Sequence, residues 1–244
     1  MKEIQDGYQN EFYFVLEFNN KRIKELNPML REVIDDLYPN FNDESIIKSW
    51  RNHINIEKGD IILKINNCIR SISVKKGMRN SIHLESIYSF KNFLDDLGID
   101  KNIINMYENF HYGKFQNTII SGEEYKKRFK NEIMIINEAF STININKVID
   151  RFILKGKISK YPIDGIIYGT PKDFFWIKKD DIIEIINKSL NTTSNGIHIG
   201  CLFIQPLNRC LNQNTKYLKY RDYVQVKWYS IFDDIIRFKN DKLQ

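Results

Sequence analysis

The chain has 244 residues, of which 42% are hydrophobic and 28% are charged, and its formal net charge is +6. This composition is that of a globular protein with a buried core, and it excludes an intrinsically disordered chain; the length fits one large domain or two small ones. The positive charge favours a polyanionic partner such as nucleic acid, although Lys and Asn are abundant throughout the sequence.

The cysteines and the apolar runs exclude further classes. Cys68, Cys201 and Cys210 form no CxxC pair, which argues against a disulfide framework and a cysteine-based zinc site and favours reduced thiols in the cytoplasm. We expect no signal peptide, because the first ten residues are polar, and no membrane span, because no apolar run reaches about 18 residues. The motifs GxxxxGK[ST], GxGxxG, GxSxG and HExxH are all absent from the sequence.

The first predicted elements are helical. Residues 8–38 form one helix, or two helices joined near Pro28, because apolar residues recur at helical spacing on both sides of that point. Pro28 is expected to begin the second helix, since its missing N–H costs little in a first turn, and Pro39 is expected to end it. Residues 43–56 are predicted to form a short helix and then a strand at His53–Ile56.

A β-hairpin followed by a helix is predicted next. The apolar run 60–65 and the alternating segment 68–75 form two strands around Asn66–Asn67, a pair that suits a two-residue turn because Asn tolerates positive φ. A polar loop follows. Residues 82–97 then have the periodicity of an amphipathic helix, closed by Gly98 at the expected C-cap position.

The second half of the chain alternates between helical and strand patterns. Helices are predicted over most of residues 101–140, where the basic cluster 126–130 is predicted to face solvent, and at residues 147–154, 180–190 and 231–238. Strands are predicted at residues 163–168, 174–177, 197–205 and 223–229. No repeat and no Pro/Gly/Ser-rich linker divides the sequence. We therefore predict a single α/β domain over residues 1–244, with a mostly helical insertion at 101–155 and further strands and a C-terminal helix at 160–244.

The predicted hairpin brings together groups that suit phosphodiester hydrolysis. Simple pairing around the turn places Ser73 opposite Asp60, and Lys75 shares a strand face with Ser73 because side chains repeat every two residues. Hydrolysis needs a divalent ion, an activated water and a stabilised leaving oxygen. Mg²⁺ prefers oxygen ligands and keeps several waters, so one or two carboxylates suffice, and a lysine beside it can orient or deprotonate the water.

This segment has a strand that opens with Asp60, a hairpin, a second strand with Lys75 in the x-Lys position, and then a helix. In this arrangement it resembles the PD-(D/E)xK nucleases. The resemblance covers residues 8–97, the motif-bearing core. It implies a restriction-endonuclease-like α/β fold, in which a helix precedes a mixed central sheet that carries the active site on a β-hairpin, with flanking helices. It also implies that Asp60 binds Mg²⁺, or Mn²⁺ in its place, with help from Glu11 on the first helix and the backbone carbonyl of Val74.

Ser73 departs from the pattern of these nucleases, which normally have Glu or Asp two residues before the lysine. The departure removes a metal ligand, and Glu11 or Glu85 could supply the missing carboxylate. In this interpretation Ser73 holds the site by hydrogen bonding, while Lys75 positions or activates water. Asp60, Ser73, Lys75 and Glu11 are thus the candidate catalytic residues.

Two basic segments are predicted to contact nucleic acid. In residues 75–81, glycine and small polar side chains allow close approach to a backbone and donation to phosphate. In residues 208–221, amide, basic and aromatic side chains can contact base edges and stack on bases. The candidate contacts are Lys76, Arg79, Asn80, Arg209, Asn212, Lys216 and Arg221.

The leading hypothesis is a Mg²⁺-dependent DNA endonuclease of restriction or defence type. Two alternatives stay open. In the first, suggested by Ser73, the chain is a catalytically inactive nucleic-acid-binding protein on the same fold. In the second, the positive charge reflects only the overall composition, and the chain is a module that binds a partner of unknown type. A homodimer would suit an enzyme that cuts both strands, although no residue indicates one.

Overall fold

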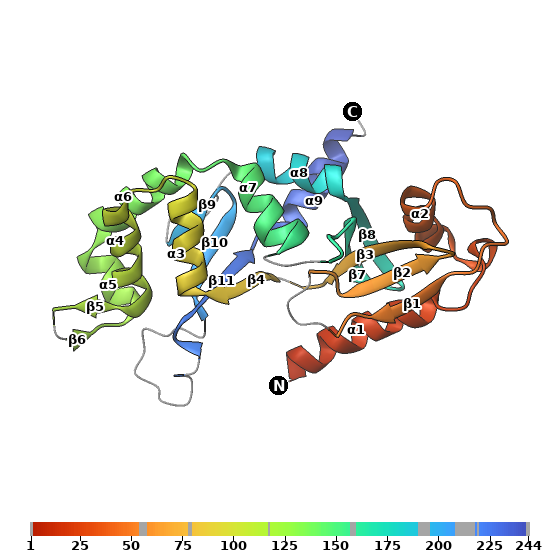
Figure 1. Ribbon diagram of the computed structural model, residues 1–244, viewed down its shortest axis with the longest axis horizontal. Helices are drawn as coiled ribbons and strands as arrows, with labels where there is room; N and C mark the ends of the chain where they lie inside the picture. The colour runs from red at the N-terminus through yellow and green to blue at the C-terminus, as the bar shows by residue number, and fades with distance from the viewer. Residues whose placement is uncertain are drawn as a thin grey trace. The chain divides into compact units, whose positions relative to one another are not determined.

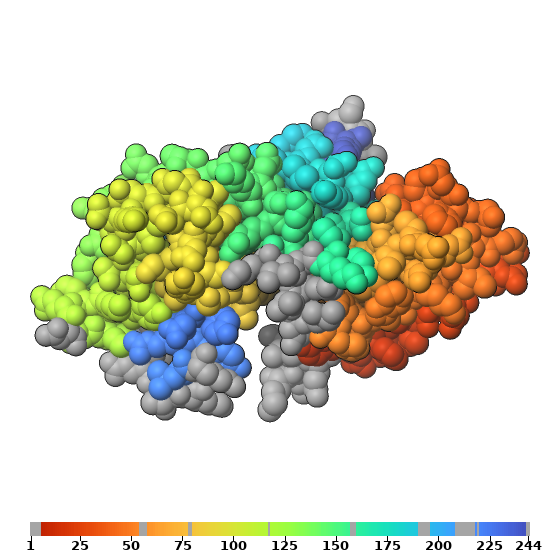
Figure 2. Space-filling model, in the orientation of Figure 1, coloured from red at the N-terminus to blue at the C-terminus, as the bar shows by residue number. Residues whose placement is uncertain are grey.

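A computed structural model describes residues 2–53, 58–77, 80–116, 118–156, 160–189, 196–207, 218 and 220–242, with side chains from residue 6 onward. The chain folds into two compact units, and each collects segments that are distant in sequence (Figure 1). Unit 1 comprises Met1–Asn80, Ile149–Ile186 and Ile231–Gln244, and unit 2 comprises Ser81–Val148 and Asn187–Ser230. The N-terminal segments, coloured red to orange, gather in one part of the visible surface (Figure 2).

Unit 1 is built on a five-stranded mixed sheet with the strand order β1-β2-β3-β7-β8. Its strands are β1 (Lys48–Arg51), β2 (Ile61–Ile65), β3 (Cys68–Lys75), β7 (Gly165–Thr170) and β8 (Asp173–Lys178). The pair β3–β7 is parallel, and the other three pairs are antiparallel. The predicted mixed central sheet built on a hairpin is therefore present.

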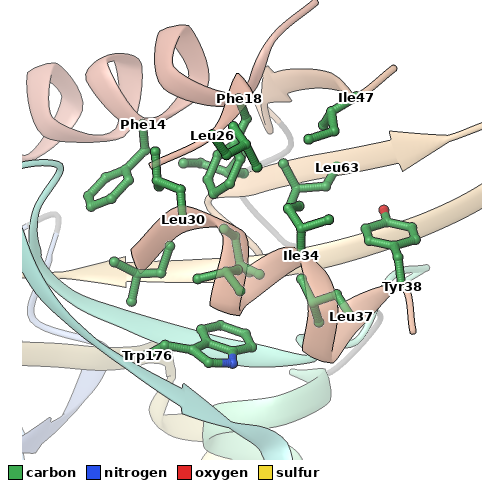
Figure 3. Close-up of a cluster of buried hydrophobic side chains, with 14 of the residues drawn as sticks. Phe14, Phe18, Leu26, Leu30, Ile34, Leu37, Tyr38, Ile47, Leu63 and Trp176 are labelled. Carbon is green, nitrogen blue, oxygen red and sulfur yellow. The ribbon is translucent and has the colours of Figure 1, made fainter. Parts of the chain in front are cut away.

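The helices and short helical turns of unit 1 flank this sheet. They are α1 (Lys2–Phe18), η1 (Ile23–Glu25), α2 (Pro28–Leu37), the π-helical turn η2 (Asp150–Lys155) and α9 (Ile231–Lys242), together with most of α8 (Lys179–Lys188). The core on one face of the sheet includes Phe14 and Phe18 of α1, Leu30 of α2, Leu63 of β2 and Trp176 of β8 (Figure 3). Burial of each such side chain stabilises the fold by roughly 1.5–3 kcal/mol, so this contact fixes α1 against the sheet.

The two-helix alternative for residues 8–38 is confirmed. The Asn27 side chain caps α2 by accepting a hydrogen bond from the Leu30 N–H at 2.9 Å, and Pro28 occupies the first helical position. The helix ends at Leu37, before Pro39. Asn27 and Pro28 adjoin the first turn and together determine where α2 begins, so the start of this helix could be predicted from the sequence.

The predicted hairpin is also confirmed, including its register. Asn66 has φ 52°, as its place in the tight turn requires, and Ile61 pairs with Ile72. The Asp60 N–H donates to the Ile72 carbonyl at 2.9 Å, which extends this pairing by one residue. Asp60 therefore lies opposite Ser73.

Unit 2 contains a four-stranded sheet with the order β4-β11-β10-β9. The strands are β4 (Asn80–Ser86), β11 (Tyr223–Trp228), β10 (Leu202–Pro206) and β9 (Ile197–Ile199). The helices are α3 (Ile87–Asp96), α4 (Lys101–Tyr112), α5 (Gly122–Arg128), α6 (Lys130–Ser141) and α7 (Ile145–Ile149), and β5 (Lys114–Phe115) pairs with β6 (Thr118–Ile119). Phe90, Tyr107 and Phe140 pack together at ring-centroid distances of 5.1–6.4 Å and join α3, α4 and α6 in one core.

Several predicted elements differ from the structure. Residues 82–86 belong to strand β4, and the helix predicted over 82–97 begins only at Ile87, where Ser86 caps it by accepting from the Ser89 N–H at 3.2 Å. Pairing with β11, distant in sequence, overrides the local helical periodicity. Strand β1 falls where the prediction began with a helix, and of the predicted strand at 53–56 only His53 is described, outside any strand. Within the described residues, no helix is long and apolar enough to cross a membrane.

Candidate active site

Three strands of unit 1 bring the candidate residues together where the ends of the strands meet, at one end of the sheet. Because β1–β2 and β2–β3 are antiparallel, the end of β1, the start of β2 and the end of β3 lie side by side there. Arg51 ends β1, Asp60 immediately precedes β2, and Lys75 ends β3. The site is therefore positioned by backbone pairing, a more rigid support than a loop.

Asp60 is the centre of a hydrogen-bonded cluster. Its Oδ2 atom accepts from the Ser73 hydroxyl at 2.7 Å, from the Val74 N–H at 2.7 Å and from the Lys75 ammonium at 2.9 Å. Lys75 also donates to the Val74 carbonyl at 3.2 Å. The side chains of Lys75 and Asp60 are 18% and 25% exposed, so the ion pair is partly shielded from water. The structure thus brings Asp60, Ser73 and Lys75 together.

A glycine allows the chain to approach closely just before Asp60. A Cβ atom on Gly59 would lie 1.7 Å from the Ser71 Oγ and 3.1 Å from the Ser71 Cβ. The Ser71 N–H donates to the Asp164 carboxylate at 2.9 Å, which fixes the strand opposite Gly59. Burial raises the pKa of Asp164, while the bond from Ser71 opposes that rise. A larger residue at position 59 would clash with Ser71, so Gly59 allows the chain just before Asp60 to lie close to β3.

Glu11 reaches the site from α1 and is paired with Arg51. The Arg51 Nε donates to the Glu11 Oε2 at 2.9 Å, and the side chains are 22% and 15% exposed, respectively. Burial, followed by the negative charge of Asp60, raises the pKa of Glu11, whereas Arg51 and Lys75 act in the opposite direction. Glu11 is thus close enough to Asp60 and Lys75 to respond to both charges.

Arg51 is the residue that sequence reasoning missed. Its guanidinium lies over the Tyr8 ring, 4.8 Å from the centroid, and its carboxylate partner is 40 positions away in the chain. No local motif marks an arginine at the end of a strand. Only the packing of α1 against β1 could have identified it.

A comparison with solved structures places this architecture. The chain is similar to restriction endonuclease MspI, whose crystal structure contains its cognate DNA, with a TM-score of 0.52 over 93% of each chain. The fold is restriction-endonuclease-like. Sequence identity is 13%, so the likeness is one of fold. No protein-family model matches the chain, and neither does any curated protein.

The restriction-endonuclease-like fold confirms the predicted fold class, and the site presents few ligands for a metal. No group of three or more His, Cys, Asp or Glu side chains suited to a metal occurs among the described residues. Asp60 takes its three donors on Oδ2, which leaves Oδ1 without a protein donor in the described part of the chain. Glu11 binds Arg51 through Oε2 alone. Together with the Val74 carbonyl, these are carboxylate and carbonyl oxygens, the ligand types that Mg²⁺ takes while it keeps its remaining waters, so the chemistry of the donors suits that ion.

Glu85, the other acid considered for this role, lies on β4 in unit 2. Its Oε1 is 3.6 Å from the Nε2 of His83, and both side chains are buried. Its charge contributes to the raised pKa of Tyr107. Glu85 is therefore buried in unit 2, in contact with His83 and near Tyr107.

Of the residues predicted to contact nucleic acid, Lys76, Asn80 and Arg221 are described. Lys76 pairs with the Asp6 carboxylate at 2.6 Å, and the Asn80 amide donates to the Gly77 carbonyl at 2.8 Å. The Arg221 guanidinium lies 5.8 Å from the Tyr112 ring centroid. Four more candidates lie outside the described residues: Arg79, Arg209, Asn212 and Lys216.

The backbone at Arg221 is held by α4. Burial lowers the pKa of His111 to about 4, so the ring is neutral at pH 7 and its Nε2–H donates to the Arg221 carbonyl at 2.8 Å. The Tyr112 hydroxyl donates to Asp222 at 2.7 Å, and the Asp222 carbonyl accepts from the Ile87 N–H. The end of the 208–221 segment therefore has a fixed anchor.

Proposed function

We propose that the chain is a Mg²⁺-dependent endodeoxyribonuclease of the PD-(D/E)xK class, of restriction or defence type. The observation that carries the proposal is the cluster on Asp60 Oδ2, formed by Ser73, Val74 and Lys75 at the edge of a restriction-endonuclease-like sheet. The DNA bound to the similar endonuclease MspI supports DNA as the substrate.

Asp60, Glu11 and the Val74 carbonyl would hold the magnesium ion, or manganese in its place. When bound, a divalent ion offsets charge on the scissile phosphate and promotes ionisation of a water molecule. The triple hydrogen bond on Oδ2 orients the Asp60 carboxylate so that Oδ1 is the oxygen left for a ligand. Ser73 would thus help to orient Asp60 as a metal ligand.

Lys75 would orient the attacking water. A lysine ammonium has three N–H donors, and two of them are directed at the Asp60 Oδ2 and the Val74 carbonyl. The third is left for a water molecule beside the carboxylate. Two further hydrogen bonds hold the Asp60 Oδ2, and the Val74 carbonyl belongs to the backbone of β3, so the direction of that third donor is restricted.

The four charged side chains of the site are balanced. Glu11 and Asp60 carry negative charges, and Arg51 and Lys75 carry positive ones. With Ser73 in place of an acid, the site does not acquire a third carboxylate that would repel a phosphate. A divalent ion would then give the site a net positive charge, which suits a phosphodiester substrate.

A catalytically inactive nucleic-acid-binding protein on the same fold is the second candidate. It is favoured by the neutral Ser73 and by the ion pair that occupies one oxygen of Glu11, since both reduce the affinity for a metal. The same basic residues would then serve binding alone.

Cleavage assays separate the two candidates. Plasmid and genomic DNA are incubated with Mg²⁺ or Mn²⁺ and the wild type, Asp60→Ala, Lys75→Ala or, as a control, the exposed Lys48→Ala. We expect metal-dependent cutting by the wild type and the control and none by the two site variants. Cutting that persists in the presence of a chelator or in Asp60→Ala would contradict the assignment as a metal-dependent nuclease. Salt-sensitive DNA binding by the wild type without any cutting would favour the inactive binding protein.

A further inference from the structure

We propose that Arg51 forms a binding site for a backbone phosphate of the nucleic acid strand, beside Asp60. The proposal rests on the proposed function, because it takes a nucleic acid as the ligand. It assigns a role to a residue that stands outside the predicted Asp60–Lys75 motif.

The strand register places Arg51 at the reacting edge of the sheet. Arg51 pairs with Ile61, the residue after Asp60, and the N–H of Asn52 donates to the Asp60 carbonyl at 3.0 Å. Asn52, the next residue along the chain, is therefore the one opposite Asp60, and Arg51 is a diagonal neighbour of Asp60 in strands whose backbones lie about 5 Å apart. A nucleic acid strand bound at Asp60 would then lie within reach of a long side chain at position 51.

Two neighbours hold the guanidinium in place. Glu11 accepts from Nε at 2.9 Å, and the Tyr8 ring lies beneath the guanidinium at 4.8 Å from its centroid. Arginine otherwise loses considerable side-chain entropy when it binds a ligand. With Nε and one face of the group already fixed, much of that entropy has been lost before the strand arrives.

The outer nitrogens of Arg51 remain available. Among the residues that the structure describes, neither Nη1 nor Nη2 has a protein acceptor, so four of the five guanidinium N–H donors are left. Their planar fork matches two oxygens of one phosphate. At 22% exposure the side chain is reachable yet partly shielded, and hydrogen bonds to a phosphate are stronger in such surroundings.

A purely structural role is the competing interpretation, in which Arg51 only neutralises the buried Glu11. The two interpretations differ in what the folded variant does. Loss of a structural partner lowers stability but leaves the number of phosphates contacted by the folded protein unchanged. Loss of a phosphate contact reduces the salt dependence of binding by about one contact.

The experiment measures the affinity of a fluorescent DNA duplex by anisotropy over a range of salt concentrations, in EDTA so that no cleavage occurs. Wild type is compared with Arg51→Met and with Arg31→Met, an exposed arginine of α2 that pairs with Asp43. We expect Arg51→Met to bind about tenfold more weakly and its slope of log affinity against log salt to fall by about 0.9. Arg31→Met should keep the wild-type slope.

An unchanged slope in a folded Arg51→Met would overturn the proposal, while cleavage by the wild type would leave the nuclease assignment standing. If Arg51→Met does not fold, Arg51→Lys replaces it. That variant keeps the charge but loses the fork, so we expect affinity several-fold below the wild type, and equal affinity would overturn the proposal. A wild type that binds no DNA even at low salt would instead contradict the proposed function itself.

Discussion

Ser73 is the residue at which this site departs from an acid-x-Lys pattern, and its role can be tested by deletion of one hydroxyl. Ser73→Ala removes one of the three donors to Asp60 Oδ2. A hydrogen bond to a charged group contributes about 1.5–3 kcal/mol, so we predict a loss of turnover of roughly 10- to 100-fold, measured by single-turnover cleavage.

The matched control for this prediction is Ser49→Ala. The Ser49 hydroxyl is also buried and donates one hydrogen bond, but its acceptor is the Val15 carbonyl. It should reduce thermal stability without a comparable loss of turnover. Equal losses of turnover in the two variants would show that Ser73 acts only through the stability of the fold.

Glu11 predicts a specific pH dependence of stability. Its pKa is raised above the ordinary 4.5, chiefly by burial, so just above pH 4.5 the folded protein retains a proton that the unfolded chain has released. As pH rises through this window, ionisation of Glu11 favours the unfolded chain. We predict that Glu11→Gln, which keeps an acceptor for Arg51, gains stability relative to the wild type from pH 4.5 upward, as measured by urea unfolding. Parallel pH profiles would contradict this.

The limits of sequence reasoning at the residue scale follow from chain separation. Asp60 and Ser73 lie 13 positions apart within one hairpin, so their contact could be predicted from the turn and the alternation of side chains. Arg51 and Glu11 lie 40 positions apart on a strand and a helix, and their contact depends on how α1 packs. Nothing within either segment specifies that packing.

At the scale of secondary-structure elements, Gly165 determines how β7 and β8 fit together. A Cβ on Gly165 would lie 2.2 Å from the Trp176 Cη2 and 2.6 Å from the Ile177 carbonyl oxygen. The Trp176 ring is buried and its Nε1 donates to Asp36, and the second contact is with the backbone. We predict that Gly165→Ala costs about 1–3 kcal/mol in the free energy of unfolding, measured by denaturant titration.

Gly7, within α1, provides the opposite case for the same substitution. No atom lies within 4 Å of a Cβ built there, and the residue has a helical conformation. Gly7→Ala should therefore stabilise the protein by about 0.5–1 kcal/mol, because alanine loses less backbone entropy in a helix. Destabilisation of similar size in both variants would refute the packing argument for Gly165.

Elements with local determinants were predictable, and those that depend on distant partners were not. The capped start of α2 and the Asn66–Asn67 turn are specified by adjacent residues. Residues 82–86 have helical periodicity of their own, but they pair with β11, which lies more than 130 positions later. The alternating burial of β4, with His83 and Glu85 inside and Leu84 exposed, appears only once that partner is known.

At the scale of the whole molecule, unit 1 contains all the candidate catalytic residues and also Lys76 and Asn80, while unit 2 contributes a candidate DNA contact of its own. Asp60, Ser73, Lys75 and Glu11 all belong to unit 1, whereas Arg221 belongs to unit 2. Because the chain enters each unit more than once, neither corresponds to a single continuous stretch of sequence. Composition, which is averaged along the chain, carries no trace of this division.

The division predicts separable kinetic effects of two substitutions. Arg221→Gln leaves the backbone anchor to His111 intact, because the acceptor there is the Arg221 carbonyl. We predict that it raises the DNA concentration for half-maximal cleavage about tenfold or more while the turnover at saturation stays within about twofold, since a lost DNA contact costs roughly 1–3 kcal/mol of binding. Asp60→Asn should do the reverse, with turnover abolished and binding in EDTA retained. Lys127→Gln, which removes the same charge from an exposed site on α5, should change neither quantity. A fall in turnover at saturating DNA in Arg221→Gln would place Arg221 in the chemical step and remove the basis for assigning catalysis to unit 1 alone.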